Sequence, residues 1–180
     1  MSKKAIIISG NLAQDHEFIY PYYRLLEDEF EIDVCLPDGK EALGILGTKL
    51  PPNKNQSIKK IEDLSVDHYN LLILPGGVKA MEKIRQDKKI IKFISEFDQK
   101  KKVIGCICSG AQLLISAKIV KGRKISGYYS MEDDLTNAGA IYTDLPAVID
   151  HNIVTTAHYK DLGPWMRSVL KIFYDKNKKQ

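Results

Sequence analysis

Two kinds of hydrophobic pattern alternate along the chain, and together they outline its secondary structure. Apolar stretches with the length of buried strands lie at residues 5–9, 31–36, 69–74, 102–107, 147–149 and 153–156. Between them, hydrophobic residues return every three or four positions, which predicts amphipathic helices over residues 18–26, 90–97, 111–117 and 165–173. Continuous apolar strands are buried on both faces, so this order predicts an α/β fold with a mostly parallel sheet covered by helices on both sides.

The segment from residue 40 to 57 interrupts the pattern. It has no sustained period and contains Gly44, Gly47 and a Pro-Pro pair, which predicts a loop or a small hairpin. No repeat, linker or low-complexity tract divides the rest. The chain has 180 residues, so we expect residues 1–180 to form one domain.

Composition and charge narrow the class of protein. The chain is 44% hydrophobic and 28% charged, which is typical of globular proteins rather than disordered ones. The net charge is only +4, and the basic residues fall in short scattered runs without a nucleic-acid motif. We expect these runs to be solvated faces and predict no nucleic-acid partner.

The cysteines and the lengths of the apolar runs indicate the cellular compartment in which the protein is expected. Cys35, Cys106 and Cys108 form no even disulfide framework. The longest apolar runs are too short to cross a bilayer, and the first residues do not resemble a secretory leader. We therefore expect a cytoplasmic protein without a membrane partner.

Unusual residues gather after the predicted strands, at residues 10–17, 75–77, 108–110 and 157–159. In parallel sheets of this kind, ligands bind beyond the carboxyl ends of the strands. Cys108 stands at the apex of a tight strand-to-helix turn, where a side chain is exposed and Gly110 permits a strained backbone. The following helix is expected to lower the pKa of the thiol, although Cys108 could also be one more small buried residue.

The neighbouring turns supply candidate partners for that thiol. The amides of Gly76, Gly77 and Ser109 are candidate oxyanion donors, although Gly-Gly turns often only reverse the chain. Glu17, in the first turn of the first helix, either stabilises the helix dipole or lies close to Cys108. In the second case it would be protonated whenever the thiolate forms. Cys106 and Cys35 are expected to be structural, and no cluster of metal ligands is evident.

Several separated motifs, in order, resemble the ThiJ/PfpI superfamily over nearly the whole chain. They comprise Glu17 with residues 19–22, then residues 74–77, 107–110, 122–124, 133–134 with 137–139, and 161–162 with 165–167. The resemblance implies a flavodoxin-like three-layer α/β/α sandwich, a homodimer or higher homo-oligomer, Cys108 as nucleophile and Glu17 as its carboxylate partner. A glutamate that family members supply from a neighbouring subunit falls on Glu82.

The chain departs from the PfpI-type proteases at two places. Those proteases carry a histidine directly after the nucleophile, where this chain has Ser109. After the last strand the chain has Ala157-His158-Tyr159, so His158 is a candidate replacement for the missing base. Ser109 argues against a peptidase triad, unless His158 supplies the base.

The leading expectation is an enzyme in which Cys108 attacks a small electrophilic substrate and Glu17 moves the proton. Glyoxalase, deglycase or isocyanide hydratase chemistry would use these parts. The alternatives are an intracellular cysteine peptidase or amidase, and a non-enzymatic redox sensor or chaperone-like stress protein that uses oxidation of Cys108. No metal or organic cofactor is predicted, since the chain has neither a dinucleotide fingerprint nor a phosphate loop.

Overall fold

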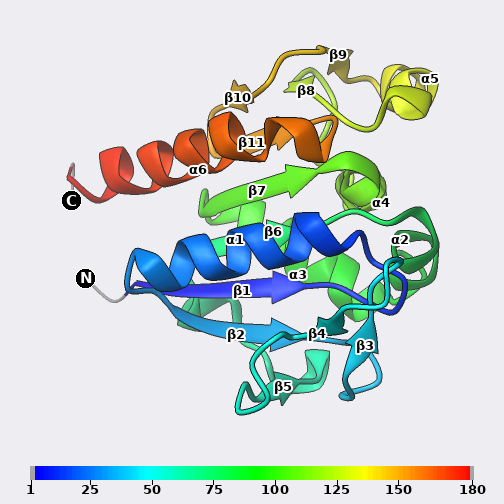
Figure 1. Cartoon of the computed structure of the whole chain (residues 1–180). Coiled ribbons are helices and arrows are strands. Elements are labelled where there is room, and N and C mark those ends of the chain that lie inside the picture. Colours follow the sequence, from blue (N-terminus) through cyan, green and yellow to red (C-terminus); the bar gives the residue numbers. More distant parts are fainter. Residues whose placement is uncertain (1–2, 179–180) are drawn as a thin grey trace.

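A seven-stranded sheet forms the centre of the protein in the computed structural model, which describes residues 3–178 (Figure 1). Its strand order is β10-β11-β7-β6-β1-β2-β5, and every pair is parallel except β10 with β11. The strands are β1 (Lys4–Ile8), β2 (Glu31–Cys35), β5 (Ile58–Lys59), β6 (Leu71–Leu74), β7 (Val103–Ile107), β10 (Val148–Asp150) and β11 (Ile153–Thr156).

Helices cover both faces of this sheet. One face carries α1 (Asp15–Glu27) and α6 (Leu162–Asn177), and the other carries α3 (Lys88–Gln99) and α4 (Ala111–Ser116) (Figure 1). Strands β6, β7 and β11 are buried along their whole length between the two layers. The predicted three-layer sandwich with a mostly parallel sheet is therefore confirmed.

Helix α3 shows how the sequence produces one of these layers. Its apolar residues Ile90, Phe93, Ile94 and Phe97 recur at helical spacing, and all four are buried against the sheet. The helix begins where the Asp87 side chain accepts hydrogen bonds from two backbone N–H groups of the first turn.

The strand order creates a switch point between β1 and β6. The helix after β1 packs on one face, whereas α2 (Val78–Ile84) and α3 after β6 lead to the other face. The loops at the carboxyl ends of these two strands therefore diverge and leave room for a ligand. Glu17 follows β1 along the chain, Gly76 follows β6, and Cys108 follows the adjacent strand β7.

The predicted strands and helices are present with ends that differ by a few residues, and the segment from residue 40 to 57 contains the expected hairpin. That hairpin pairs β3 (Ala42–Leu43) with β4 (Lys49–Leu50). The pattern missed α2, α5 (Glu132–Asn137), edge strand β5, and a second small sheet of β8 (Lys124–Ile125) and β9 (Ile141–Tyr142). Elements this short contain too few residues to establish a period.

Single turns of 3-10 helix complete the structure, at η1 (Ile61–Asp63), η2 (Val66–His68), η3 (Cys108–Gly110), η4 (Tyr129–Met131) and η5 (Tyr159–Asp161). None of the helices within residues 3–178 combines the length and the apolar character needed to cross a membrane.

Candidate active site

Cys108 occupies the sharp bend between β7 and the turn that leads into α4. Its φ of 59° lies in the left-handed region, which a non-glycine residue adopts only at a cost of about 1–3 kcal/mol. Gly110 makes the bend possible, because a Cβ there would lie 2.7 Å from the carbonyl oxygen of Leu74. The bend predicted from the sequence is confirmed, and Cys108 is partly exposed whereas Cys35 and Cys106 are buried.

Glu17 reaches the same point from the first turn of α1. Its side chain is 1% exposed, and Oε2 accepts a hydrogen bond of 2.8 Å from the backbone N–H of Gly76. A Cβ on Gly76 would lie 2.4 Å from Oε2 of Glu17 and 3.1 Å from Sγ of Cys108. The carboxyl group and the thiol therefore meet over a residue that has no side chain to separate them.

Burial raises the pKa of the Glu17 carboxyl to about 7, although the Gly76 N–H and the contact with Cys108 favour the ionised form. A buried carboxyl group with this pKa exchanges its proton readily near neutral pH. It has the proton affinity required of a general acid or base.

The pKa of Cys108 is raised to about 12, first by burial and second by the negative charge of Glu17, while the N–H of Ser109 acts in the opposite direction. The expectation that the following helix lowers this pKa is therefore wrong. Helix α4 has only six residues and begins after a 3-10 turn, so its dipole is weak. Protonation of Glu17 removes the repulsion, so a thiolate forms most easily when Glu17 holds the proton.

The three candidate oxyanion donors are not equivalent. The N–H of Gly76 already donates to Glu17, so its expected role as an oxyanion donor is replaced by the positioning of the carboxylate. Gly77, with φ of 102°, is the N-cap residue directly before α2. Its N–H has no backbone acceptor within residues 3–178. Both the N–H and the buried hydroxyl group of Ser109 favour the ionised form of Cys108, although the hydroxyl group makes no hydrogen bond of standard geometry in the described part of the chain.

Cys108 opens into a cavity of about 430 Å³ between the switch point and the segments after β8 and β11. The lining residues are Gln14, Glu17, Ile45, Gly77, Val78, Cys108, Ser109, Gln112, Tyr128, Ser130, Met131, His158 and Tyr159. The structure thus gathers five of the predicted site residues in one cavity, Cys108, Glu17, Gly77, Ser109 and His158.

His158 shares this cavity but is held in a particular way. Its Nδ1 accepts a hydrogen bond of 3.2 Å from the backbone N–H of Lys160, so in the neutral ring Nε2 carries the proton. The ring also packs against Tyr159, with 4.0 Å between the ring centroids. A neutral His158 therefore offers a donor to a ligand, and its catalytic role remains a prediction.

Glu82 lies outside the cavity. It is exposed on α2 and does not line the space around Cys108 in its own chain. A contribution to the site of a neighbouring subunit remains a prediction.

Sequence reasoning missed several lining residues. Gln112 stands four residues after Cys108, one helical turn further along, and that spacing could have identified it. Tyr128 gives no local signal. Its backbone N–H donates to the carbonyl oxygen of Cys108 at 3.2 Å, a contact between segments that are distant in sequence.

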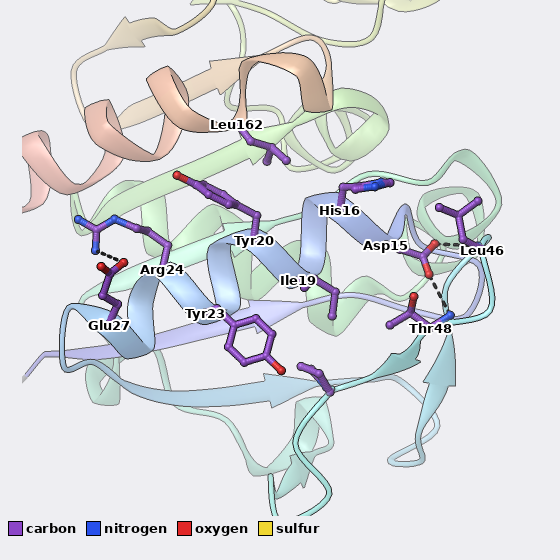
Figure 2. A pocket seen from close by; sticks show the side chains of 11 residues that line it. Asp15, His16, Ile19, Tyr20, Tyr23, Arg24, Glu27, Leu46, Thr48 and Leu162 are labelled. Atoms are coloured by element: carbon purple, nitrogen blue, oxygen red, sulfur yellow. Dashed lines mark hydrogen bonds and ion pairs between the residues drawn. The ribbon is translucent and has the colours of Figure 1, made fainter.

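A larger open groove of about 980 Å³ runs along the outward face of α1 (Figure 2). Tyr20, Tyr23 and Arg24 of the helix project into it, and it contains no cysteine. At one end the Asp15 carboxylate accepts hydrogen bonds from the backbone N–H groups of Leu46, at 2.8 Å, and Thr48, at 3.0 Å. Asp15 thereby fastens the β3–β4 hairpin to the start of α1.

Within residues 3–178, no three side chains of His, Cys, Asp or Glu lie close enough together to hold a metal ion. The groups that surround the Cys108 thiol are the Glu17 carboxyl group and the neighbouring backbone amides.

Known proteins share both this sequence and this architecture. The sequence is 33% identical over 169 residues to Deglycase PfpI of Pyrococcus furiosus, covering 94% of this chain and 98% of that protein. It is 31% identical over 162 residues to General stress protein 18 of Bacillus subtilis, covering 89% and 91% of the two chains.

A solved structure has the same fold. A two-domain protein of Anabaena variabilis, described as containing DJ-1/ThiJ/PfpI-like and ferritin-like domains, superposes with a TM-score of 0.87 at 26% identity. The match covers 94% of this chain and 48% of that protein. The sequence model of the DJ-1/PfpI family matches residues 3–172, which include β1, the bend at Cys108 and most of α6. Because the family model matches residues 3–172 and Deglycase PfpI is 33% identical over 98% of its length, the chain belongs to the DJ-1/PfpI family.

Proposed function

We propose that the protein is a cysteine-dependent enzyme that acts on a small reactive carbonyl compound, in the manner of a glyoxalase or deglycase. The observation that carries this proposal is the meeting of the Cys108 thiol and the Glu17 carboxyl group over Gly76, at the wall of a cavity. A nucleophile and a proton carrier in direct contact are the two parts that addition to a carbonyl requires.

In the first step, the sulfur of Cys108 bonds to the aldehyde carbon of a substrate R–CO–CHO. The thiol proton passes to Glu17 and from there to the aldehyde oxygen, which gives a hemithioacetal. The N–H groups of Gly77 and Ser109 are available to the oxygen while it is negatively charged.

In the second step, Glu17 takes the proton from the carbon bonded to sulfur and returns it to the neighbouring carbon, while the hydroxyl proton moves from the oxygen on the first carbon to the oxygen on the second. The result is a thioester of a 2-hydroxy acid. Water then cleaves the thioester and restores the thiol, so the net reaction adds one water molecule and needs no outside oxidant. When an amine has already added to the aldehyde, sulfur replaces the amine at that carbon: the C–S bond forms, the C–N bond breaks, and Glu17 passes the thiol proton to the departing amine.

The test is production of lactate from methylglyoxal, with release of an amine from its methylglyoxal adduct as a second assay. We expect turnover by the wild type, none by Cys108→Ser, and a loss of about 10²- to 10⁴-fold in Glu17→Gln. Cys35→Ala is the control, because Cys35 is buried outside the cavity. Failure of the wild type on both substrates would overturn the proposal.

A matched pair of glycine variants tests the geometry. Gly76→Ala places a methyl group 2.4 Å from Oε2 of Glu17, whereas the same substitution at Gly163 meets nothing within 4 Å. We expect Gly76→Ala to lose turnover and Gly163→Ala to keep it. Equal activity in the two variants would show that contact between the acid and the thiol is not needed.

A redox-sensing role is a second candidate, because Cys108 alone among the three cysteines is not buried. Oxidation by peroxide would be selective for this thiol. Rapid oxidation of Cys108 in mass spectra, with no turnover of any carbonyl compound, would favour this role. Peptide hydrolysis has less support, since Ser109 supplies a hydroxyl group where a base is required.

We also propose that the chain forms a homodimer or a higher homo-oligomer in which Glu82 approaches a neighbouring site. Its exposure on α2 leaves it free for such a contact. Light scattering would give the oligomeric state, and a change in activity of Glu82→Ala without a change in that state would support the contribution to a neighbouring site.

A further inference from the structure

The wall of the Cys108 cavity opposite the switch point is built of aromatic rings that pack against one another, Tyr128 with His158 in stacked and His158 with Tyr159 in tilted orientation. Ring centroids are 6.2 Å apart between Tyr128 and His158, in stacked orientation, and 4.0 Å apart between His158 and Tyr159. The stack continues beyond the cavity to His16, 5.1 Å from Tyr159, and to Tyr129, 6.2 Å from His158. Each ring is supported by its neighbours, so the wall presents a pre-organised surface to a flat group.

The other side of the cavity is aliphatic and partly open to solvent. Ile45 is 53% exposed at the tip of the β3–β4 hairpin, and Val78 is 51% exposed at the start of α2. Both residues line the cavity together with the buried Met131. Hydrophobic side chains that line a cavity and remain exposed gain free energy when an apolar ligand covers them.

Positive charge is missing from the lining. None of the residues around the cavity is Lys or Arg. Arg85 is not part of the lining. Its side chain donates hydrogen bonds to Gln112, at 3.3 Å, and to Ser116, at 3.0 Å. Lys160 lies over the ring of Tyr129, which does not line the cavity. A carboxylate or phosphate on a ligand would therefore meet no positively charged side chain in the cavity and would lie close to Glu17.

We infer that the substrate is uncharged and carries a flat or bulky apolar group beside its reactive carbonyl, as in an aryl glyoxal. That group lies between the aromatic wall of Tyr128, His158 and Tyr159 and the aliphatic side formed by Ile45 and Val78. This inference rests on the proposed carbonyl chemistry at Cys108 and names its substrate class. Glyoxylate and other anionic aldehydes are excluded.

Alkylation of Cys108 tests the cavity without requiring turnover. Phenacyl bromide carries a ring, iodoacetamide is small and neutral, and iodoacetate is small and anionic. The rate of alkylation at Cys108 is measured by mass spectrometry for each reagent. Dividing it by the rate of the same reagent with N-acetylcysteine corrects for the intrinsic reactivity of the reagent. We expect the phenacyl reagent to be favoured over iodoacetamide by about tenfold or more, and iodoacetate to be disfavoured by a similar factor.

Substitutions assign these preferences to particular residues. Tyr128→Ala should remove most of the phenacyl preference, whereas Tyr128→Phe should keep it, because the ring and not the hydroxyl group provides the contact. Tyr23→Ala is the control, since Tyr23 is an exposed tyrosine on α1 outside this cavity. Val78→Lys should raise the relative rate of iodoacetate by about threefold to tenfold, and Val78→Gln, of similar length but neutral, should not.

Turnover separates this inference from the proposed function. Phenylglyoxal should be converted with a higher kcat/KM than methylglyoxal, and glyoxylate should be the poorest of the three. Turnover of methylglyoxal equal to that of phenylglyoxal, together with normalised alkylation rates that are equal for all three reagents, would overturn the inference and leave the function standing. Absence of turnover with every aldehyde, with the alkylation preferences intact, would overturn the function and leave the cavity's preference standing.

Discussion

Gly76 decides the geometry of the candidate site at the scale of single residues. Its N–H holds the Glu17 carboxylate, and its bare Cα leaves space for that carboxylate and the Cys108 sulfur on the same side. Cys108 in turn adopts a left-handed backbone conformation that places its side chain over the glycine. Strain at one residue and the missing side chain of another therefore bring an acid and a nucleophile together.

Burial of Glu17 should be visible in the pH dependence of stability. Its pKa is raised from 4.5 to about 7, so the folded state holds this proton more tightly than the unfolded state. The stabilisation of the folded state that comes from this proton is therefore fully present below about pH 4.5. The free energy of unfolding then declines by up to about 3 kcal/mol as the pH rises to about 7.

We expect Glu17→Gln to gain stability relative to the wild type as the pH rises from 5 to 8, as measured by urea unfolding at each pH. The amide cannot ionise, so the variant avoids burial of a charge. A difference between the two proteins that stays constant over this range would contradict the raised pKa of Glu17.

The β3–β4 hairpin illustrates the scale of elements. It has only two residues in each strand, and it is held to α1 through Asp15. Burial alone would raise the pKa of Asp15, but hydrogen bonds from Thr48 and Leu46 outweigh it and lower the pKa below its usual value. The hairpin carries Ile45 to the mouth of the Cys108 cavity, so Asp15 is a positioning residue for that wall.

We expect Asp15→Asn to lower the free energy of unfolding by about 1–2 kcal/mol and to speed hydrogen exchange at the amides of Leu46 and Thr48. The stabilisation by Asp15 is present above pH 3.8, the usual pKa of the group, and is lost as the pH falls through its lower folded value.

Asp38→Asn is the matched control for this experiment, because Asp38 is exposed and forms a surface ion pair with the exposed Lys83. Unchanged exchange at Leu46 and Thr48 in Asp15→Asn would mean that the hairpin does not depend on this carboxylate.

At the scale of the whole molecule, stability and chemistry occupy opposite ends of the sheet. At the amino ends of β7 and β11, Asp98 accepts hydrogen bonds from Arg123 at 2.9 Å and from Asn152 at 3.0 Å. Both charged side chains are largely buried, with exposures of 15% for Arg123 and 11% for Asp98. Five residues of β7, or roughly 16 Å of extended chain, separate this cluster from Cys108.

We expect Arg123→Ala to destabilise the protein by about 3–5 kcal/mol, because it leaves the Asp98 carboxylate buried without its positively charged partner. The rate of Cys108 alkylation in the fraction that remains folded should not change. The double variant Arg123→Met with Asp98→Leu should recover most of the stability, because it removes both buried charges. A loss in the double variant as large as in Arg123→Ala would contradict this account.

The sequence by itself determined the layers of the fold and the location of the candidate nucleophile, Cys108. Apolar runs are long enough to identify the main strands, and Cys108 follows such a run immediately before Gly110, so the bend can be predicted from local residues. The family resemblance then added Glu17 as the partner of Cys108.

Only the tertiary structure decided what surrounds the thiol. The use of the Gly76 amide by Glu17, the raised pKa of Cys108 and the ring wall of Tyr128, His158 and Tyr159 all depend on contacts between segments far apart in the chain. Burial and hydrogen-bond partners are properties of packing, whereas hydrophobic periodicity records only which residues turn inward. The rings of this wall come from segments without a hydrophobic period, and only folding brings them to the cavity around Cys108.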